Sequence, residues 1–184
     1  MFIRSERLFL RPGWPEDQAD LLAAIGDEAV VRNLARAPWP YTADDARDFL
    51  ALPQERLLPR LFVTLPSAQD ARLIGGAGLS REGDAVNLGY WIARPYWGQG
   101  YATEAVRAVL SLARALGHRT IVAHHFQDNP ASGRVLRKTG FCPTGERALR
   151  YSAGRAGVGV TSHYALDLAA PGGCGDDVPI MRAA

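Results

Sequence analysis

The residues with the clearest chemical potential lie in a glycine-spaced stretch, Trp97, Gly98, Gln99, Gly100, Tyr101, Ala102 and Thr103. Glycine allows backbone angles that other residues disfavour, so the stretch is typical of a tight turn, and the apolar pattern after it predicts a helix. The first amides of a helix have no intrahelical partner, and the aligned peptide dipoles add about half a positive charge there. Such a turn therefore suits a phosphate group. The alternative is a turn that needs its glycines only to be tight, since the residues of a Walker loop or a dinucleotide fingerprint are missing.

A second segment, residues 128–141, carries polar side chains on a short helix. Its pattern gives a cap residue, Pro130 at the first helical position, basic residues in the last turn and Gly140 as the stop. The side chains that could do chemistry here are those of Asn129, Ser132, Arg134 and Arg137. The structural alternatives are a helix cap for Asn129, an exposed hydroxyl for Ser132 and a solvated helix face for the arginines.

Together the two segments resemble the GCN5-related N-acetyltransferases, and within them the branch that acetylates ribosomal-protein N-termini. That family's phosphate loop, Arg/Gln-x-x-Gly-x-Gly/Ala, is matched by Gly100 and Ala102, while Trp97 occupies the Arg/Gln position. Asn-x-x-Ser followed by Leu-x-Lys-x-Gly-Phe, over residues 129–141, is also similar to the ribosomal branch. The resemblance covers roughly residues 3 to 168.

The resemblance implies an acyltransferase that moves the acetyl group of acetyl-CoA directly to a primary amine in a ternary complex. A backbone N–H of Ile92 or Ala93 would meet the oxyanion, and amides from Gly98 to Thr103 would hold the pyrophosphate. Asn129 would reach the pantetheine arm, and Ser132 would protonate the departing thiolate. Arg134 and Arg137 would attract the phosphates of the cofactor.

The general base is not evident in the sequence. Members of the branch often carry Glu two residues before Gly-Tyr-Trp, and this chain has Asn87 there, which cannot accept a proton at neutral pH. The candidates that could replace it are Glu82, Asp84, His124, His125 and His163. Because successive strand residues point to opposite faces, at most one of His124 and His125 should line a given face.

These residues must be positioned by an α/β (α+β) single-domain fold, with a mixed, mainly antiparallel seven-stranded sheet flanked by helices. The apolar runs predict strands over residues 7–11, 61–65, 73–79, 86–93, 120–125, 144–151 and 158–168. A helix crossover joins parallel strands, so the strands on either side of the central helix should be parallel. In the family these two strands splay, which here would be Leu88–Ala93 and Ile121–His125. Thr42 and Asp45 have the spacing of a capping box for a helix over 43–52.

The charge, the apolar stretches and the cysteines of the sequence exclude several classes of function. The net charge of +2 comes from 21 basic and 19 acidic residues spread along the chain, which gives no footprint for nucleic acid. The N-terminus lacks the apolar core of a secretory signal, and no stretch approaches the ~20 apolar residues of a membrane span, so we expect a cytoplasmic protein. The two cysteines lack metal-like spacing, and we expect no metal. The domain should cover residues 1–168, with a flexible tail over 169–184.

The acceptor amine and the oligomeric state are left open by the sequence. A protein or peptide N-terminus is the first hypothesis, a small amine such as an antibiotic or polyamine is the second, and a non-catalytic CoA-binding protein is the third. Carboxylates lining the acceptor site would favour a polycation, and the nearest candidates are Asp44, Asp45 and Asp48. A homodimer is possible by analogy with the family.

Overall fold

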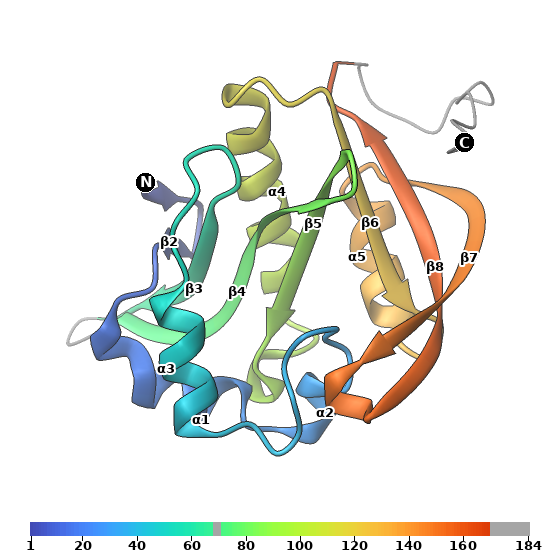
Figure 1. Ribbon diagram of the computed structural model, residues 1–184. Coiled ribbons are helices and arrows are strands. Elements are labelled where there is room, and N and C mark those ends of the chain that lie inside the picture. The colour runs from blue at the N-terminus through green and yellow to red at the C-terminus, as the bar shows by residue number, and fades with distance from the viewer. Residues whose placement is uncertain (68–70, 170–184) are drawn as a thin grey trace.

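The computed structural model describes residues 1–67 and 71–169, which form one sheet flanked by helices. Its eight strands follow the order β1-β2-β3-β4-β5-β6-β8-β7 (Figure 1). They are β1 (Ile3–Arg4), β2 (Phe9–Arg11), β3 (Arg60–Pro66), β4 (Ala71–Glu82), β5 (Ala85–Ile92), β6 (Thr120–Phe126), β7 (Cys142–Ser152) and β8 (Gly157–Asp167). The prediction of seven strands was wrong by one, because β1 has only two residues and forms by pairing with β2.

The helices follow the caps that the sequence provides. They are α1 (Gln18–Ile25), α2 (Glu28–Val31), α3 (Ala43–Ala51), α4 (Tyr101–Ala115) and α5 (Pro130–Lys138), with short 3-10 turns η1 (Pro15–Asp17), η2 (Arg94–Tyr96) and η3 (Ala153–Arg155). The expected capping box of α3 is present: Thr42 Oγ1 accepts from the Asp45 amide at 3.2 Å, and the Thr42 amide donates to the Asp45 carboxylate at 2.8 Å.

The two faces of the sheet carry different helices and separate apolar clusters. The face covered by α4 and α5 includes Leu88 and Ile92 of β5, packed with Val106, Val109 and Leu136. The opposite face packs against α1, α2 and α3 through a second cluster that contains Leu21, Val31, Phe62 and Leu73. Even-numbered residues of β5 therefore face α4, and odd-numbered residues face the other side.

The centre of the sheet is the pair β5 and β6, which is parallel as predicted and is flanked by antiparallel pairs. These two strands pair at Asn87 and Val122 and then diverge toward their C-terminal ends (Figure 1). We call the diverging segments, residues 88–92 of β5 and 123–126 of β6, the fork.

Close backbone approach explains the glycines of β4. A Cβ on Gly76 would lie 2.7 Å from the indole nitrogen of Trp91, and one on Gly75 would meet the Trp91 carbonyl. In the described part of the chain, no helix has the length and apolar character needed to cross a membrane. The expected flexible tail lies, from residue 170 onward, outside the described residues.

Candidate active site

The turn before α4 presents backbone amides at the end of β5. Gly98 and Gly100 have φ angles of +76° and +83°, in the left-handed region that favours glycine. Gly100 is the N-cap and has no side chain to cap the helix, whose first intrahelical bond runs from the Glu104 amide to the Gly100 carbonyl at 3.1 Å. The amides of Tyr101, Ala102 and Thr103 therefore precede the hydrogen-bonded part of the helix and can bind an anion.

Two side chains of the predicted phosphate turn form hydrogen bonds to carbonyls that precede the turn. Trp97 Nε1 donates to the Ile92 carbonyl at 2.6 Å, and Gln99 Nε2 donates to the Pro95 carbonyl at 3.1 Å. Their contacts position the turn, and the contribution left for anion binding is that of the backbone.

A third element, the segment before β2, also fixes the turn. The Glu104 carboxylate accepts from the Arg7 amide at 2.7 Å, from Ser5 Oγ at 2.7 Å and from Arg7 Nε at 2.8 Å. The Arg7 side chain also donates to the Gln99 carbonyl at 3.0 Å. Burial alone would raise the pKa of Glu104, but these hydrogen bonds outweigh it and lower the pKa. No local pattern could reveal this contact, because its partners lie 97 residues apart.

The oxyanion donor can be chosen between the two predicted amides. The Ala93 amide donates to the Ile74 carbonyl at 2.8 Å and is therefore engaged with β4. Amides of an antiparallel strand alternate in direction, so the Ile92 amide turns the other way, toward β6 and into the fork. Ile92 is the residue of the two whose amide faces the fork, whereas Ala93 does not have a free amide.

On the other side of the fork, α5 begins with Asn129 and Ser132. Asn129 Oδ1 accepts from the Ser132 amide at 3.3 Å, so Asn129 is the N-cap of α5. Ser132 Oγ lies 2.7 Å from the hydroxyl of Tyr90, and either atom can be the donor. The Tyr90 hydroxyl also donates to the Ser132 carbonyl at 2.9 Å. Burial raises the pKa of Tyr90, even though the hydrogen bond with Ser132 lowers it, so Tyr90 stays protonated at neutral pH.

The arginines of α5 differ in their surroundings. Arg137 Nη1 donates to the Tyr164 hydroxyl at 3.0 Å, which lies 3.4 Å from His125 Nε2. Arg137 thereby lines a shallow cavity of about 350 Å³ with His125 and Gly133, between α5 and β8. Arg134 is exposed to solvent. Among the described residues, neither arginine forms a hydrogen bond or ion pair with the turn that begins α4.

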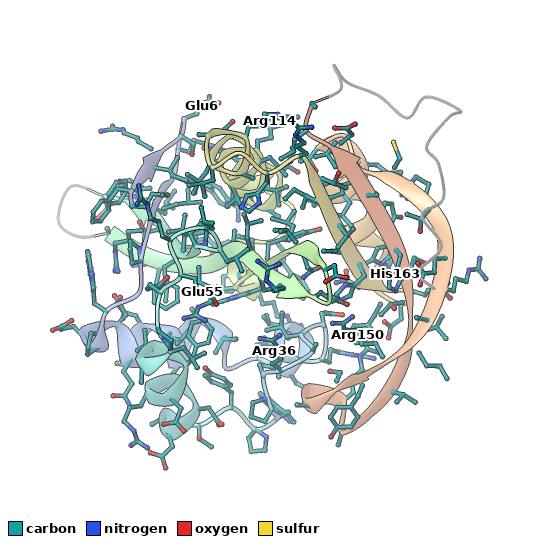
Figure 2. All side chains as sticks on the ribbon, turned by 45° about the horizontal axis from the view of Figure 1, so that its top comes forward. Glu6, Arg36, Glu55, Arg114, Arg150 and His163 are labelled. Atoms are coloured by element: carbon teal, nitrogen blue, oxygen red, sulfur yellow. The ribbon has the colours of Figure 1, made fainter. Side chains whose placement is uncertain are left out.

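The face of the sheet opposite α4 carries a polar cluster, which consists of Glu82, Asn87, His124, Arg150 and His163. Arg150 Nη1 lies 2.6 Å from one Glu82 oxygen, and His124 Nδ1 lies 3.7 Å from the other. The His124 and His163 rings are 5.7 Å apart. Figure 2 shows Arg150 and His163 on the same side of the β7–β8 hairpin. Burial alone would raise the pKa of Glu82, but Arg150 and His124 outweigh it and lower the pKa.

The two neighbouring histidines of β6 point to opposite faces, as predicted. His125 lies against Tyr164 on the α5 side, with ring centroids 5.5 Å apart, whereas His124 belongs to the polar cluster. Burial and the nearby Arg150 lower the pKa of His124 to about 4, against the raising effect of Glu82. Asp84 is exposed in the turn between β4 and β5, away from these contacts.

On β5, the residues on this face beside the polar cluster are Asn87 and Gly89. Asn87 is 8% exposed, and its Oδ1 is buried without a hydrogen-bond partner among the described residues. Arg150 Nε is likewise buried without a hydrogen-bond partner among the described residues. Gly89 is exposed, and a Cβ built on it would meet nothing within 4 Å. The cluster thus combines two unmet hydrogen-bonding groups with open space over the neighbouring glycine.

Comparison with known proteins agrees with this geometry. Residues 7–142 match the family model of the acetyltransferase (GNAT) domain. The uncharacterized N-acetyltransferase YoaA of Bacillus subtilis (strain 168) is 30% identical over 148 residues, which are 76% of this chain and 81% of that protein.

Solved structures share the fold. A GNAT-family acetyltransferase from Bacillus anthracis superposes with a TM-score of 0.76 at 22% identity, covering 91% of this chain and 99% of that one. RimL, a ribosomal L7/L12 alpha-N-protein acetyltransferase solved in complex with coenzyme A, has a TM-score of 0.75 at 18% identity, covering 91% and 98%.

The family model spans most of the chain and reaches from the segment that braces the phosphate turn through β5, α4 and α5. These are the elements that supply the turn amides, the Ile92 amide and the Ser132–Tyr90 pair. The chain therefore belongs to the GNAT acetyltransferase family and is an acyltransferase that uses acetyl-CoA as its acetyl donor.

Proposed function

We propose that this enzyme acetylates the N-terminal amine of a protein or peptide, by direct transfer from acetyl-CoA in a ternary complex. The observation that carries the proposal is the convergence of three kinds of group on the fork. The amides that begin α4 lie at its β5 end, the Ile92 amide faces its interior, and Ser132 with Tyr90 closes its α5 side.

Each group suits one need of the reaction. The amides of Tyr101, Ala102 and Thr103 would bind the pyrophosphate through the helix N-terminus. The Ile92 amide would stabilise the oxyanion, a contribution that is about 3 to 4 kcal/mol for a single donor in other enzymes. Ser132 would give a proton to the departing thiolate, and its contact with Tyr90 would orient that hydroxyl.

The charges around the polar cluster favour a peptide over a polyamine. The carboxylates of α3 are occupied on the helix surface, since Asp45 caps the helix while Asp44 and Asp48 pair with Arg47. Within the cluster, Glu82 is neutralised by Arg150. A polycation would need a row of unpaired carboxylates. A peptide N-terminus instead offers an N–H donor and a carbonyl acceptor, which match the unmet Asn87 Oδ1 and Arg150 Nε.

The first test is calorimetric titration of acetyl-CoA into the wild type, a Gly100→Trp variant and a Gly117→Trp control. Both glycines have φ angles above +80° at opposite ends of α4, so both substitutions strain the backbone alike. We expect micromolar binding that Gly100→Trp abolishes and Gly117→Trp retains. Equal binding by both variants would show that the turn is not the phosphate site.

The second test compares acceptors with the same enzyme by mass spectrometry. Peptides with a free N-terminus should be acetylated there, whereas N-terminally blocked peptides with a free lysine and the polyamine spermidine should react at least 10-fold more slowly. Preferential acetylation of spermidine would favour a small-amine acetyltransferase. Binding of acetyl-CoA without transfer to any amine would favour a non-catalytic CoA-binding protein.

A further inference from the structure

We propose that His124 accepts the proton of the acceptor amine, while the acceptor chain behind that amine lies over Gly89 and donates a backbone N–H to Asn87 Oδ1. This inference rests on the acetyl transfer proposed above. It concerns the removal of a proton from the amine, a step that the turn amides, Ile92 and Ser132 do not perform. An amine that attacks a thioester must lose a proton, and the carboxamide of Asn87 cannot accept one at neutral pH.

The register of the sheet identifies His124. Beyond the pairing of Asn87 with Val122, the first positions on the same face are Gly89 on β5 and His124 on β6. The residues of these two strands on this face are Ala85, Asn87, Gly89 and Trp91 from β5 and Thr120, Val122, His124 and Phe126 from β6. Both strands lie wholly within the described residues, and His124 is the one side chain of this set with a basic nitrogen that can accept a proton.

The space over Gly89 is open, and the buried Asn87 Oδ1 on the same face favours a ligand that donates a hydrogen bond. Gly89 offers open space on the same face of the sheet as His124, where any other residue would place a side chain. Asn87 Oδ1 is a buried acceptor without a partner, which costs free energy until a donor reaches it. A backbone N–H of an acceptor peptide above Gly89 would supply that donor.

Charged and titratable groups from the neighbouring strands surround His124. It faces Glu82 from β4, Arg150 from β7 and His163 from β8, and His125 is its neighbour on β6. Burial and Arg150 keep the imidazole neutral at pH 7, so its lone pair is available. Glu82, 3.7 Å from Nδ1, stabilises the imidazolium once it forms and leaves Nε2 as the nitrogen that meets the amine.

The step balances as follows. The lone pair of the neutral amine forms the N–C bond at the acetyl carbonyl, and the negative charge on the carbonyl oxygen is met by the Ile92 amide. His124 Nε2 accepts one proton from the nitrogen as the C–S bond breaks, and the Ser132 hydroxyl gives one proton to the thiolate. Solvent takes the proton from His124 and returns one to Ser132, so amide and free thiol form without net proton change.

The test is chemical rescue of a His124→Ala variant by added imidazole. We expect kcat to fall about 10²-fold, within the range of general-base losses, while acetyl-CoA affinity by calorimetry changes less than 2-fold. Imidazole should raise the rate of His124→Ala with increasing concentration and leave the wild type unaffected. His124→Gln, which fills the space, should lose the same rate without rescue. His118→Gln serves as the control, because His118 lies outside the polar cluster and its side chain hydrogen-bonds the Leu57 carbonyl.

Three outcomes overturn the inference. An unchanged kcat in folded His124→Ala would show that no proton passes through this residue. A loss that imidazole does not restore would assign His124 a structural role. Wild-type protein that binds acetyl-CoA and acetylates no amine would remove the proposed function itself, and this failure is separate because it appears before any variant is made.

Discussion

Two hydroxyl groups share the α5 side of the fork, and their contact decides how each behaves. Ser132 Oγ and the Tyr90 hydroxyl are 2.7 Å apart, and Tyr90 is largely buried with a raised pKa. A serine hydroxyl that is fixed by a protonated tyrosine has one preferred direction, whereas a free one rotates. Under the proposed function, the pair would therefore act as a unit in delivering a proton to the thiolate.

The unit can be tested by a double-mutant cycle on kcat. We expect Ser132→Ala to lower kcat about 10²-fold and Tyr90→Phe about 10-fold, with the double variant no worse than Ser132→Ala alone. Tyr151→Phe is the control, since Tyr151 is 60% exposed. Losses that multiply in the double variant would mean that the two hydroxyls act independently.

The sequence identifies those site residues that a local pattern marks. Asn129 and Ser132 stand at the start of a helix with recognisable caps, and Gly100 stands at a turn. Tyr90 and Arg150 are missed for the same physical reason as Glu104. Tyr90 meets Ser132 across 42 residues and Arg150 meets Glu82 across 68, and only the fold brings such partners together.

At the scale of elements, α4 is held at its first turn by the chain segment before β2. Glu104 accepts three hydrogen bonds there, and its side chain is 13% exposed. The direction in which the turn amides point therefore depends on a contact with the beginning of the chain. This brace belongs to the phosphate site as much as the glycines do.

Removing the brace should weaken the protein measurably. We expect Glu104→Ala to lower the free energy of unfolding by about 1 to 2 kcal/mol, because the Arg7 amide and Ser5 hydroxyl lose their acceptor. Asp44→Ala removes a pair whose side chains are 61% and 76% exposed, and it should change stability by less than about 0.5 kcal/mol. Urea denaturation measures both, and equal effects would show that the brace is only a surface ion pair.

Elements with strong periodicity or caps were predictable, and their pairing was predictable where a helix connects parallel strands. The parallel arrangement of β5 and β6 follows from α4 between them, and the capping box of α3 follows from Thr42 and Asp45. The strand β1 was missed because two residues are too few to show the alternation of apolar and polar residues typical of a strand. It forms by pairing with the open edge of β2. The choice of Ile92 over Ala93 likewise needed the register with β4.

For the whole molecule, the polar cluster makes stability depend on pH. The folded protein lowers the pKa of His124 from 6.5 to about 4, so folding favours the neutral form. The unfolded chain therefore binds a proton at this site between pH 6.5 and about 4, and the folded chain does not. Stability from this group is complete above pH 6.5 and is lost as the pH falls toward 4, by about 3 kcal/mol in all.

Urea denaturation at pH 7, 5.5 and 4.5 measures this loss. His124→Gln should flatten the curve between pH 6.5 and 4, leaving the contribution of the carboxylates, among them Glu82 with its lowered pKa, at lower pH. If the wild type and His124→Gln lose stability in parallel over this window, His124 is not the group responsible.

The divergence of β5 from β6 has a consequence for how the reaction cycle is ordered. Ser132 and Tyr90 reach the fork from the face that carries α4 and α5, whereas Gly89 and His124 lie on the opposite face. Under the proposals above, the donor would meet the fork from one face of the sheet and the acceptor from the other, so their binding sites would not overlap. On this arrangement neither substrate would have to leave before the other binds.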